Sequence, residues 1–264
     1  MPECPGPIAG RLEALPPISL GEMDSIRLMN RIDTKFMTEE ETLARILSDA
    51  FRCGYRALLA DGVKLSPYNS LYYDTADLKM FLDHHNRRLV REKIRTRVYL
   101  SSGATFLEVK RKNNKGRTRK KRTRIAPELF WDFRGEKEAV DYLEGHSSYT
   151  AEGISPALET TFDRITLVNA AMTERLTIDM NLRFRNLRTG RTADLGDGVI
   201  IELKQDGRGE SDMKRILLSL RVKPVRISKY CIGTTLTDPD AKSNRFKVKV
   251  RAIRKIIHTK ITTS

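Results

Sequence analysis

The chain has 264 residues, of which 39% are hydrophobic and 31% charged, so it is long enough and apolar enough to bury a core. Its net charge of +15 favours an anionic partner: nucleic acid, a nucleotide, polyphosphate or an acidic membrane surface. Three scattered cysteines argue against a disulfide framework or a cysteine zinc site, and no signal peptide or apolar membrane span is evident. We therefore expect a cytoplasmic protein with one main domain.

The chain divides into three regions by composition. Residues 1–23 are rich in Pro and Gly and are expected to form an N-terminal arm, and residues 24–236 are expected to form the folded domain. Residues 237–264 are expected to be a basic C-terminal tail, which contains no acid from Lys242 onward. This tail could be an arm for an anionic surface, a docking segment or a solvated tail.

Alternating apolar and polar residues predict the first elements. They indicate a strand at 31–37, a helix capped by Thr38, strands at 55–59 and 70–75, and a short helix at 76–86.

Residues 91–124 then predict three consecutive strands, each with one cationic face, because side chains alternate across a strand. The residues on that face are Arg91, Lys93, Arg95, Arg97 and Tyr99; Phe106, Glu108, Lys110 and Lys112; and Lys120, Arg122 and Arg124. A row of like charges repels itself, so a polyanion is the expected ligand.

The second half continues the pattern. A helix is expected over 127–143 with Trp131 facing the core, followed by a strand at 156–168 that carries Phe162 and Arg164 on one face. Residues 175–184 alternate most regularly, so Arg175, Thr177, Asp179, Asn181 and Arg183 are predicted to share one face. The last strand, at 199–205, carries Glu202 and Lys204, and a helix over 209–220 and an extended segment at 225–228 follow.

The amphipathic helices need an apolar surface to cover, and the apolar faces of the strands are the only large candidate. If helices cover those faces, the charged faces of the strands are left to face one another. Closing such a sheet into a barrel removes its edges and gives a charged interior, which an anion and a metal ion would neutralise.

The ordered motifs resemble one known family. They are RIDTKF at 31–36, SLYYDT at 70–75, KIRTRVY at 93–99, FLEVKRK at 106–112, TFDRITL at 161–167, RLTIDMNL at 175–182, IIELK at 200–204 and ISKY at 227–230. Over about residues 24–236 the sequence resembles the catalytic domain of the VTC polyphosphate polymerases, within the triphosphate tunnel metalloenzyme (CYTH-like) superfamily.

The resemblance implies an α+β fold: a closed antiparallel eight-stranded β-barrel, the triphosphate tunnel, with helices packed on its outside. In this family the tunnel binds ATP and inorganic polyphosphate, and the terminal phosphate of the chain attacks the γ-phosphate of ATP. Carried over residue by residue, the catalytic tunnel cations are Lys35, Arg95, Arg97, Lys110, Arg122, Arg164, Arg175 and Lys229. The further substrate-binding candidates are Arg31, Lys93, Tyr99, Lys112, Arg183, Lys204 and Ser228.

The resemblance also implies a metal site. Glu202 is the expected carboxylate ligand of Mn²⁺ or Mg²⁺, with phosphate oxygens completing the coordination shell. Glu108, Glu159 and Asp179 are weaker candidates for metal binding, and a buried salt bridge to an arginine is an equal alternative for each.

Two departures from the superfamily pattern are visible. Hydrolytic members begin with an ExExK strand, whereas the sequence here is Arg31-Ile32-Asp33-Thr34-Lys35. The smaller number of acids favours polymerase chemistry over two-metal hydrolysis. The sequence also lacks the regulatory SPX domain and membrane spans of the eukaryotic polymerases, so transport would require a separate membrane protein as partner.

Two alternatives stay open. The first is a triphosphate or polyphosphate hydrolase of the same fold. The second is a non-catalytic module that binds polyphosphate or nucleic acid; aromatic stacking residues are few on the polar faces, so we expect no nucleic acid. The oligomeric state is not predicted.

Overall fold

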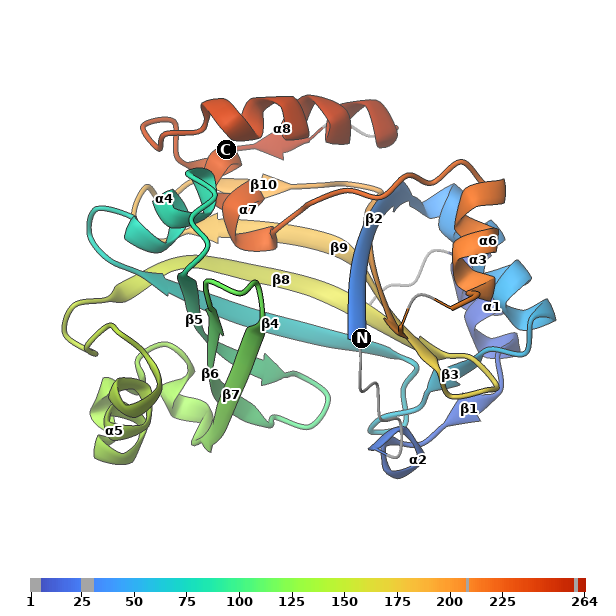
Figure 1. Ribbon diagram of the computed structural model, residues 1–264, viewed down its shortest axis with the longest axis horizontal. Helices are drawn as coiled ribbons and strands as arrows, with labels where there is room; N and C mark the ends of the chain where they lie inside the picture. The colour runs from blue at the N-terminus through green and yellow to red at the C-terminus, as the bar shows by residue number, and fades with distance from the viewer. Residues whose placement is uncertain (1–5, 25–30, 208, 259–260) are drawn as a thin grey trace.

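The computed structural model describes residues 6–24, 31–207, 209–258 and 261–264, and it has a mixed α+β fold (Figure 1). The strands are β1 Pro17–Ile18, β2 Arg31–Glu39, β3 Arg56–Leu58, β4 Leu65–Asp74, β5 Arg91–Tyr99, β6 Thr105–Lys112, β7 Thr118–Ile125, β8 Ser155–Val168, β9 Glu174–Asn186, β10 Thr192–Asp194, β11 Gly198–Asp206 and β12 Thr262–Thr263. The helices are α1 Gly6–Ala14, α2 Leu20–Asp24, α3 Glu40–Arg52, α4 Lys79–His85, the short 3₁₀ helices η1 Pro127–Phe130 and η2 Phe133–Gly135, α5 Lys137–His146, α6 Asp212–Ser219, α7 Lys229–Thr237 and α8 Asn244–Ile256.

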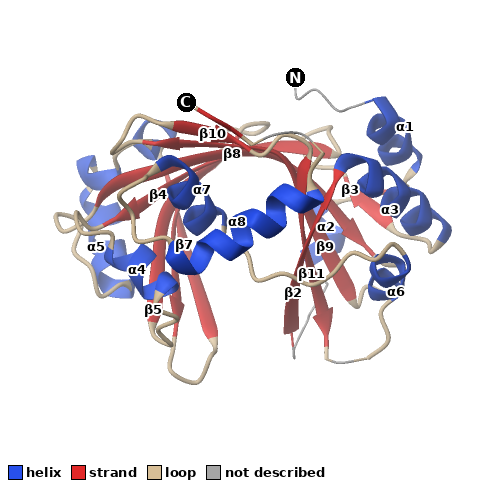
Figure 2. Cartoon of the chain, turned by 90° about the horizontal axis from the view of Figure 1, so that it is seen from above, coloured by secondary structure: helices blue, strands red, loops and turns tan. Residues whose placement is uncertain are grey.

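Eight long antiparallel strands form the centre of the molecule in the order β2-β11-β9-β8-β4-β5-β6-β7. The sheet curves into an arch (Figure 2). No pairing joins β2 to β7 among the described residues, so the sheet is open where a closed barrel was predicted. Both of these edge strands carry cations, such as Lys35 and Lys120, on the concave face, so they repel each other when no anion lies between them.

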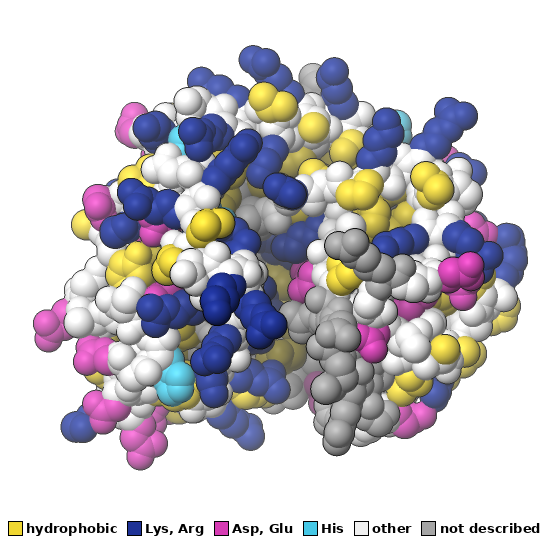
Figure 3. All heavy atoms as spheres, viewed as in Figure 1, with side chains coloured by type: hydrophobic (Ala, Val, Ile, Leu, Met, Phe, Trp, Pro, Cys, Tyr) yellow, Lys and Arg dark blue, Asp and Glu magenta, His cyan; other side chains and the backbone are white. Residues whose placement is uncertain are grey.

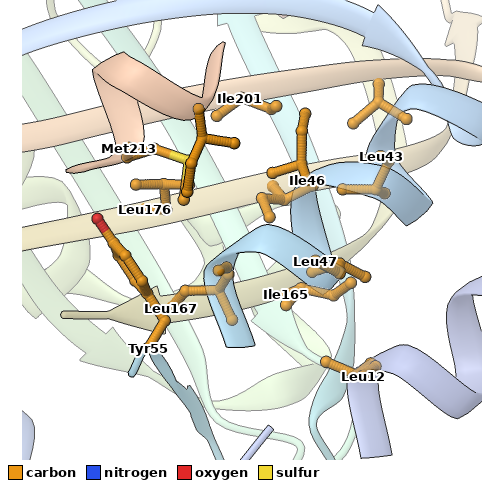
Figure 4. Packing of buried hydrophobic residues seen from close by; sticks show 14 of the residues in the cluster. Leu12, Leu43, Ile46, Leu47, Tyr55, Ile165, Leu167, Leu176, Ile201 and Met213 are labelled. Atoms are coloured by element: carbon orange, nitrogen blue, oxygen red, sulfur yellow. The ribbon is translucent and has the colours of Figure 1, made fainter. Parts of the chain in front are cut away.

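Helices cover the convex face of the arch at both sides. On one side, α1, α3 and α6 bury the apolar residues of β8, β9 and β11, and Leu43, Ile46 and Leu47 of α3 are fully buried there (Figure 4). The predicted N-terminal arm therefore contributes a packed helix, α1. Helix α3 begins at Glu40, and its N-cap is Glu39 instead of Thr38, because β2 extends further than expected.

On the other side, η1, η2 and α5 cover β5 and β6, with Phe133 and Leu143 completely buried. The single helix predicted over 127–143 is broken into these three pieces. Trp131 lies at the break and is 47% exposed, so its predicted place in the core is wrong.

The third group of helices, α4, α7 and α8, lies under the arch and closes one end of its concave side (Figure 2). The basic tail contributes α8, which buries Phe246, Val250 and Ile253 against α4, α7 and β2. Spacings of four and three residues put these three side chains on one face of a helix. None of the described helices combines the length and the apolar character needed to cross a membrane.

Candidate functional site

A buried glutamate holds two cations on the concave face of β5, β6 and β7. Arg95 donates from Nε and Nη2 to Glu108 Oε2, at 2.7 and 2.5 Å, and Lys120 Nζ lies 2.5 Å from Glu108 Oε1. Arg95 Nη1 also donates to the Tyr72 hydroxyl at 3.0 Å. Burial opposes ionisation of Glu108, but Arg95, Arg97 and Lys120 hold its pKa well below the usual range. Glu108 therefore forms the buried salt bridge to an arginine that was one of the two predictions for it.

A buried aspartate, Asp179, likewise pairs with two cations on β8, β9 and α7. Arg164 donates from Nε and Nη2 to the two oxygens of Asp179, at 2.6 and 2.8 Å, and Lys229 donates to the same carboxylate. Ser228 caps α7, so Lys229 is the first residue of that helix and its position is fixed by the cap. Burial lowers the pKa of Lys229 to about 8, although Asp179 opposes this shift.

Two aromatic rings pack against Arg97 and Arg164. Tyr68 and Phe162 stack with ring centroids 5.3 Å apart. Arg97 lies over both rings, 5.3 and 5.6 Å from their centroids, and Arg164 lies 5.0 and 5.2 Å from them. Arg97 donates to Ser70 Oγ at 2.9 Å, and burial together with Arg95 lowers its pKa to about 10. Cationic side chains are thus crowded together before any anion binds.

Glu202 lies on β11 between two lysines. Its Oε1 is 2.9 Å from Lys204 Nζ and its Oε2 is 3.7 Å from Lys35 Nζ. Burial opposes ionisation, but Lys204 and Lys35 lower the pKa of Glu202 below its usual range, so it is a carboxylate at neutral pH. A hard divalent cation could use this carboxylate, and Asp33 lines the same cavity.

The residues that the structure describes do not form a group of three potential metal ligands around Glu202. Among the described residues, the one group of three potential ligands is Glu39, Glu41 and His258 at the start of α3. A Mn²⁺ or Mg²⁺ ion at Glu202 would therefore depend on phosphate oxygens for most of its ligands.

The concave face opens into a cavity of about 850 Å³. Figure 3 shows lysine and arginine side chains gathered around a hollow on this side of the molecule. Lys93 Nζ donates to Ser228 Oγ at 2.9 Å, and burial lowers the pKa of Lys93 to about 8. The predicted site residues that line this cavity are Lys35, Lys93, Lys110, Lys112, Glu202 and Ser228.

Other predicted residues reach the concave face from neighbouring strands. Arg122 packs over the ring of Phe106, 4.7 Å from its centroid, and Tyr99 contacts the same ring edge-on. Arg175 lies opposite Lys204 in the pairing of β9 with β11. Arg31 begins β2, but its side chain lies outside the described residues.

The predicted place of Arg183 beside Arg175 does not match the structure. The register of β8 against β9 shifts between Thr161 and Asp163, and Asn181 adopts a positive φ of 54°. This β-bulge reverses the alternation, so Arg183 points to the opposite face, is 72% exposed and pairs with Asp194. Glu159 also lies outside the cavity and accepts from Asn69 at 2.6 Å.

Several residues of the site were missed by sequence reasoning. Ser70 and Tyr72 come from β4, where the alternation in SLYYDT could have placed them on the polar face with the arginines. His84 of α4 and Lys249 of α8 also line the cavity. No local pattern signals them, because helices distant in sequence bring them there.

The arrangement defines a class of protein: a curved antiparallel sheet with outer helices and a cationic concave face suited to a phosphate-rich anion. The profile of the VTC domain matches residues 30–237. The chain therefore belongs to the VTC domain family, and the resemblance stated from its motifs is confirmed.

Solved structures are similar to this chain at low identity. A proposed adenylyl cyclase from Hippeastrum, HpAC1, reported to have a dominant triphosphatase activity, is 13% identical with a TM-score of 0.50, covering 78% of this chain and 95% of that one. Proposed adenylate cyclases from Bacillus halodurans and Vibrio parahaemolyticus are 14% and 12% identical, with TM-scores of 0.49 and 0.46. The alignments cover 76% of this chain and 96% of the Bacillus chain, and 78% and 99% for the Vibrio chain. No curated protein matches the chain.

Proposed function

We propose that this protein is a polyphosphate polymerase, which transfers the γ-phosphate of ATP to the end of an inorganic polyphosphate chain. The observation that carries the proposal is the buried cluster of Arg95, Arg97, Arg164 and Lys229 on one concave face, close to the carboxylate of Glu202. Burying several like charges is unfavourable unless an anion neutralises them. A polyanion of repeated phosphates offers a charge for each of these cations.

The proposed chemistry requires positioning and charge neutralisation more than a protein nucleophile. Arg95 and Arg164 are oriented by Glu108 and Asp179, so their free N–H groups can bind phosphate oxygens with little loss of side-chain entropy. The attacking group is a phosphate oxygen of the chain, and the leaving group is ADP. A divalent cation, when bound at Glu202 and the phosphates, would supply further neutralisation of the transferred group.

We infer that bound polyphosphate also completes the tunnel. Lys35 on β2 and Lys120 on β7 lie on the two edge strands of the arch, which do not pair with each other among the described residues. A chain of phosphates between these edges would replace their mutual repulsion by attraction to a shared anion. The proposal includes the cytoplasmic location expected from the sequence, because ATP is available there. It also includes a separate membrane protein that receives the product.

A hydrolase is the second candidate, favoured by the triphosphatase activity reported for the Hippeastrum relative. Hydrolysis requires that a water molecule attack the phosphate in place of the chain end. The small number of free carboxylates around Glu202 argues against two-metal activation of water. A non-catalytic binding module would not need a divalent cation at Glu202.

The product of the reaction distinguishes these candidates. Purified protein would be incubated with ATP and Mn²⁺, with and without a short polyphosphate primer, and the products resolved on a gel stained for polyphosphate. The polymerase predicts a polymer with matching release of ADP. Free phosphate without polymer would support the hydrolase, and tight triphosphate binding without turnover would support the binding module.

A further inference from the structure

One end of the cavity carries cations that are more accessible than the arginines deeper in the arch: Arg87 and Arg226 are exposed and Lys249 is half-buried, whereas Arg97 is buried. Arg95, Arg164 and Glu202 belong to ion pairs. At the end closed by α4, α7 and α8, no ion pair with a carboxylate involves Arg87, Arg226 or Lys249, as far as the described residues extend. All three line the same cavity, and the charges of Arg87 and Arg226 help to lower the pKa of Lys249 after the larger effect of burial.

The backbone holds these three cations together from separate elements. Arg87 follows the end of α4 and has a positive φ of 59°. Glycine is the usual residue in this left-handed conformation, so an arginine here raises the conformational energy of the backbone. Helix α8 is fixed to α4 because Phe246 packs on Phe81 and His85, at ring distances of 5.5 and 5.6 Å. This packing places Lys249 at the cavity, although α8 lies beyond the residues matched by the VTC domain.

We propose that Arg87, Arg226 and Lys249 form a separate subsite that binds the polyphosphate chain beyond the phosphates held by the deeper cations. The proposal rests on the proposed function, since it identifies where a chain longer than triphosphate continues. Cations without carboxylate partners are free to bind successive phosphates without first breaking an ion pair. The aromatic side chains at this end of the cavity, among the described residues, are the buried Phe246 and the half-buried His84, so no exposed ring is available for stacking of nucleic acid bases.

The subsite predicts a dependence of binding on chain length. In Arg226→Gln/Lys249→Gln protein, affinity for a polyphosphate chain of tens of phosphate units should fall about tenfold, because two phosphate contacts are lost. Affinity for inorganic triphosphate should stay within about twofold of the unchanged protein, because triphosphate occupies the deeper cations. The salt dependence of binding to the long chain should also become less steep.

The matched control is Lys247→Gln/Arg251→Gln, which removes two charges from the exposed side of α8. This control should leave the affinity for both ligands unchanged within about twofold. Arg87→Gly is a second test, because glycine adopts the backbone conformation of Arg87 without strain. This variant should also lose affinity for the long chain and keep its affinity for triphosphate.

Isothermal titration calorimetry with triphosphate, long polyphosphate and a single-stranded oligonucleotide separates the outcomes. The subsite would be overturned if the double variant lost equal affinity for triphosphate and the long chain, or if the control variant lost as much affinity as the double variant. Either result would leave the proposed function intact. An oligonucleotide that binds as tightly as polyphosphate and shows the same losses would overturn the assignment to polyphosphate. Failure of both phosphate ligands to bind the unchanged protein would overturn the proposed function together with the subsite.

Discussion

Arg164 and Asp179 are held side by side across β8 and β9 by two hydrogen bonds, at 2.6 and 2.8 Å, and Lys229 binds the same carboxylate. One buried carboxylate therefore pairs with two buried cations, so the group keeps a net positive charge that a ligand can neutralise. Glu108 repeats the arrangement with Arg95 and Lys120. The site is thus arranged for an anion before the anion arrives.

Asp179→Asn should destabilise the protein by about 3 kcal/mol, because Arg164 and Lys229 lose their carboxylate and remain buried. Saturating triphosphate should restore part of this loss, since a bound phosphate can neutralise the same cations. Chemical denaturation with and without triphosphate measures both effects. The control Asp194→Asn breaks the exposed pair with Arg183 and should cost less than about 1 kcal/mol. Equal losses in the two variants would contradict the role of Asp179.

Arg95→Ala should weaken triphosphate binding by about ten- to a hundredfold, the range expected when hydrogen bonds to a charged group are lost. Arg111→Ala is the control from the adjacent strand: Arg111 points outward, is 53% exposed and contacts Glu92. Its removal should change the affinity by less than about threefold. Calorimetric titration gives both values, and comparable losses would show that the assignment of faces to β5 and β6 is wrong.

Triphosphate affinity should decrease as the pH rises from 7 to about 9. Lys93, Lys120 and Lys229 have pKa values of about 8 without ligand, mainly because of burial. A bound anion raises these pKa values, so binding takes up protons. The affinity for triphosphate is highest where the three lysines are protonated, well below pH 8, and it falls as the pH rises through 8. Titrations in two buffers of different ionisation enthalpy measure this proton uptake. An affinity that is constant over this range would show that these lysines do not contact the ligand.

The arginines of the site could be predicted from the sequence because strands alternate with period two, and Arg95, Arg97 and Arg164 needed only that rule. The rule failed at Arg183, because a bulge at Asn181 reverses the alternation and no residue pattern marks it. Whether the sheet closes depends on how its first and last strands lie relative to each other, and a strand-by-strand interpretation of the sequence does not compare them. Lys249 was missed for a related reason, since its position depends on packing between helices distant in sequence.

Glu202→Gln should raise the Mn²⁺ or Mg²⁺ concentration required for half-maximal activity by at least about tenfold. Glutamine keeps the shape of the side chain and removes the charge that a divalent cation requires. Glu159→Gln is the control, because Glu159 lies outside the cavity and should have no effect on metal dependence. Unchanged metal dependence of the Glu202 variant would remove Glu202 from the metal site.

The most direct test of the central claim follows the γ-phosphate itself. ATP labelled at the γ-phosphate would be mixed with excess protein, Mn²⁺ and a short polyphosphate primer, and the label would be traced after a single turnover. A polymerase should leave most of the label in primer extended by one phosphate, with an equal amount of ADP. Recovery of the label as free phosphate, unaffected by primer, would contradict the account and identify a hydrolase.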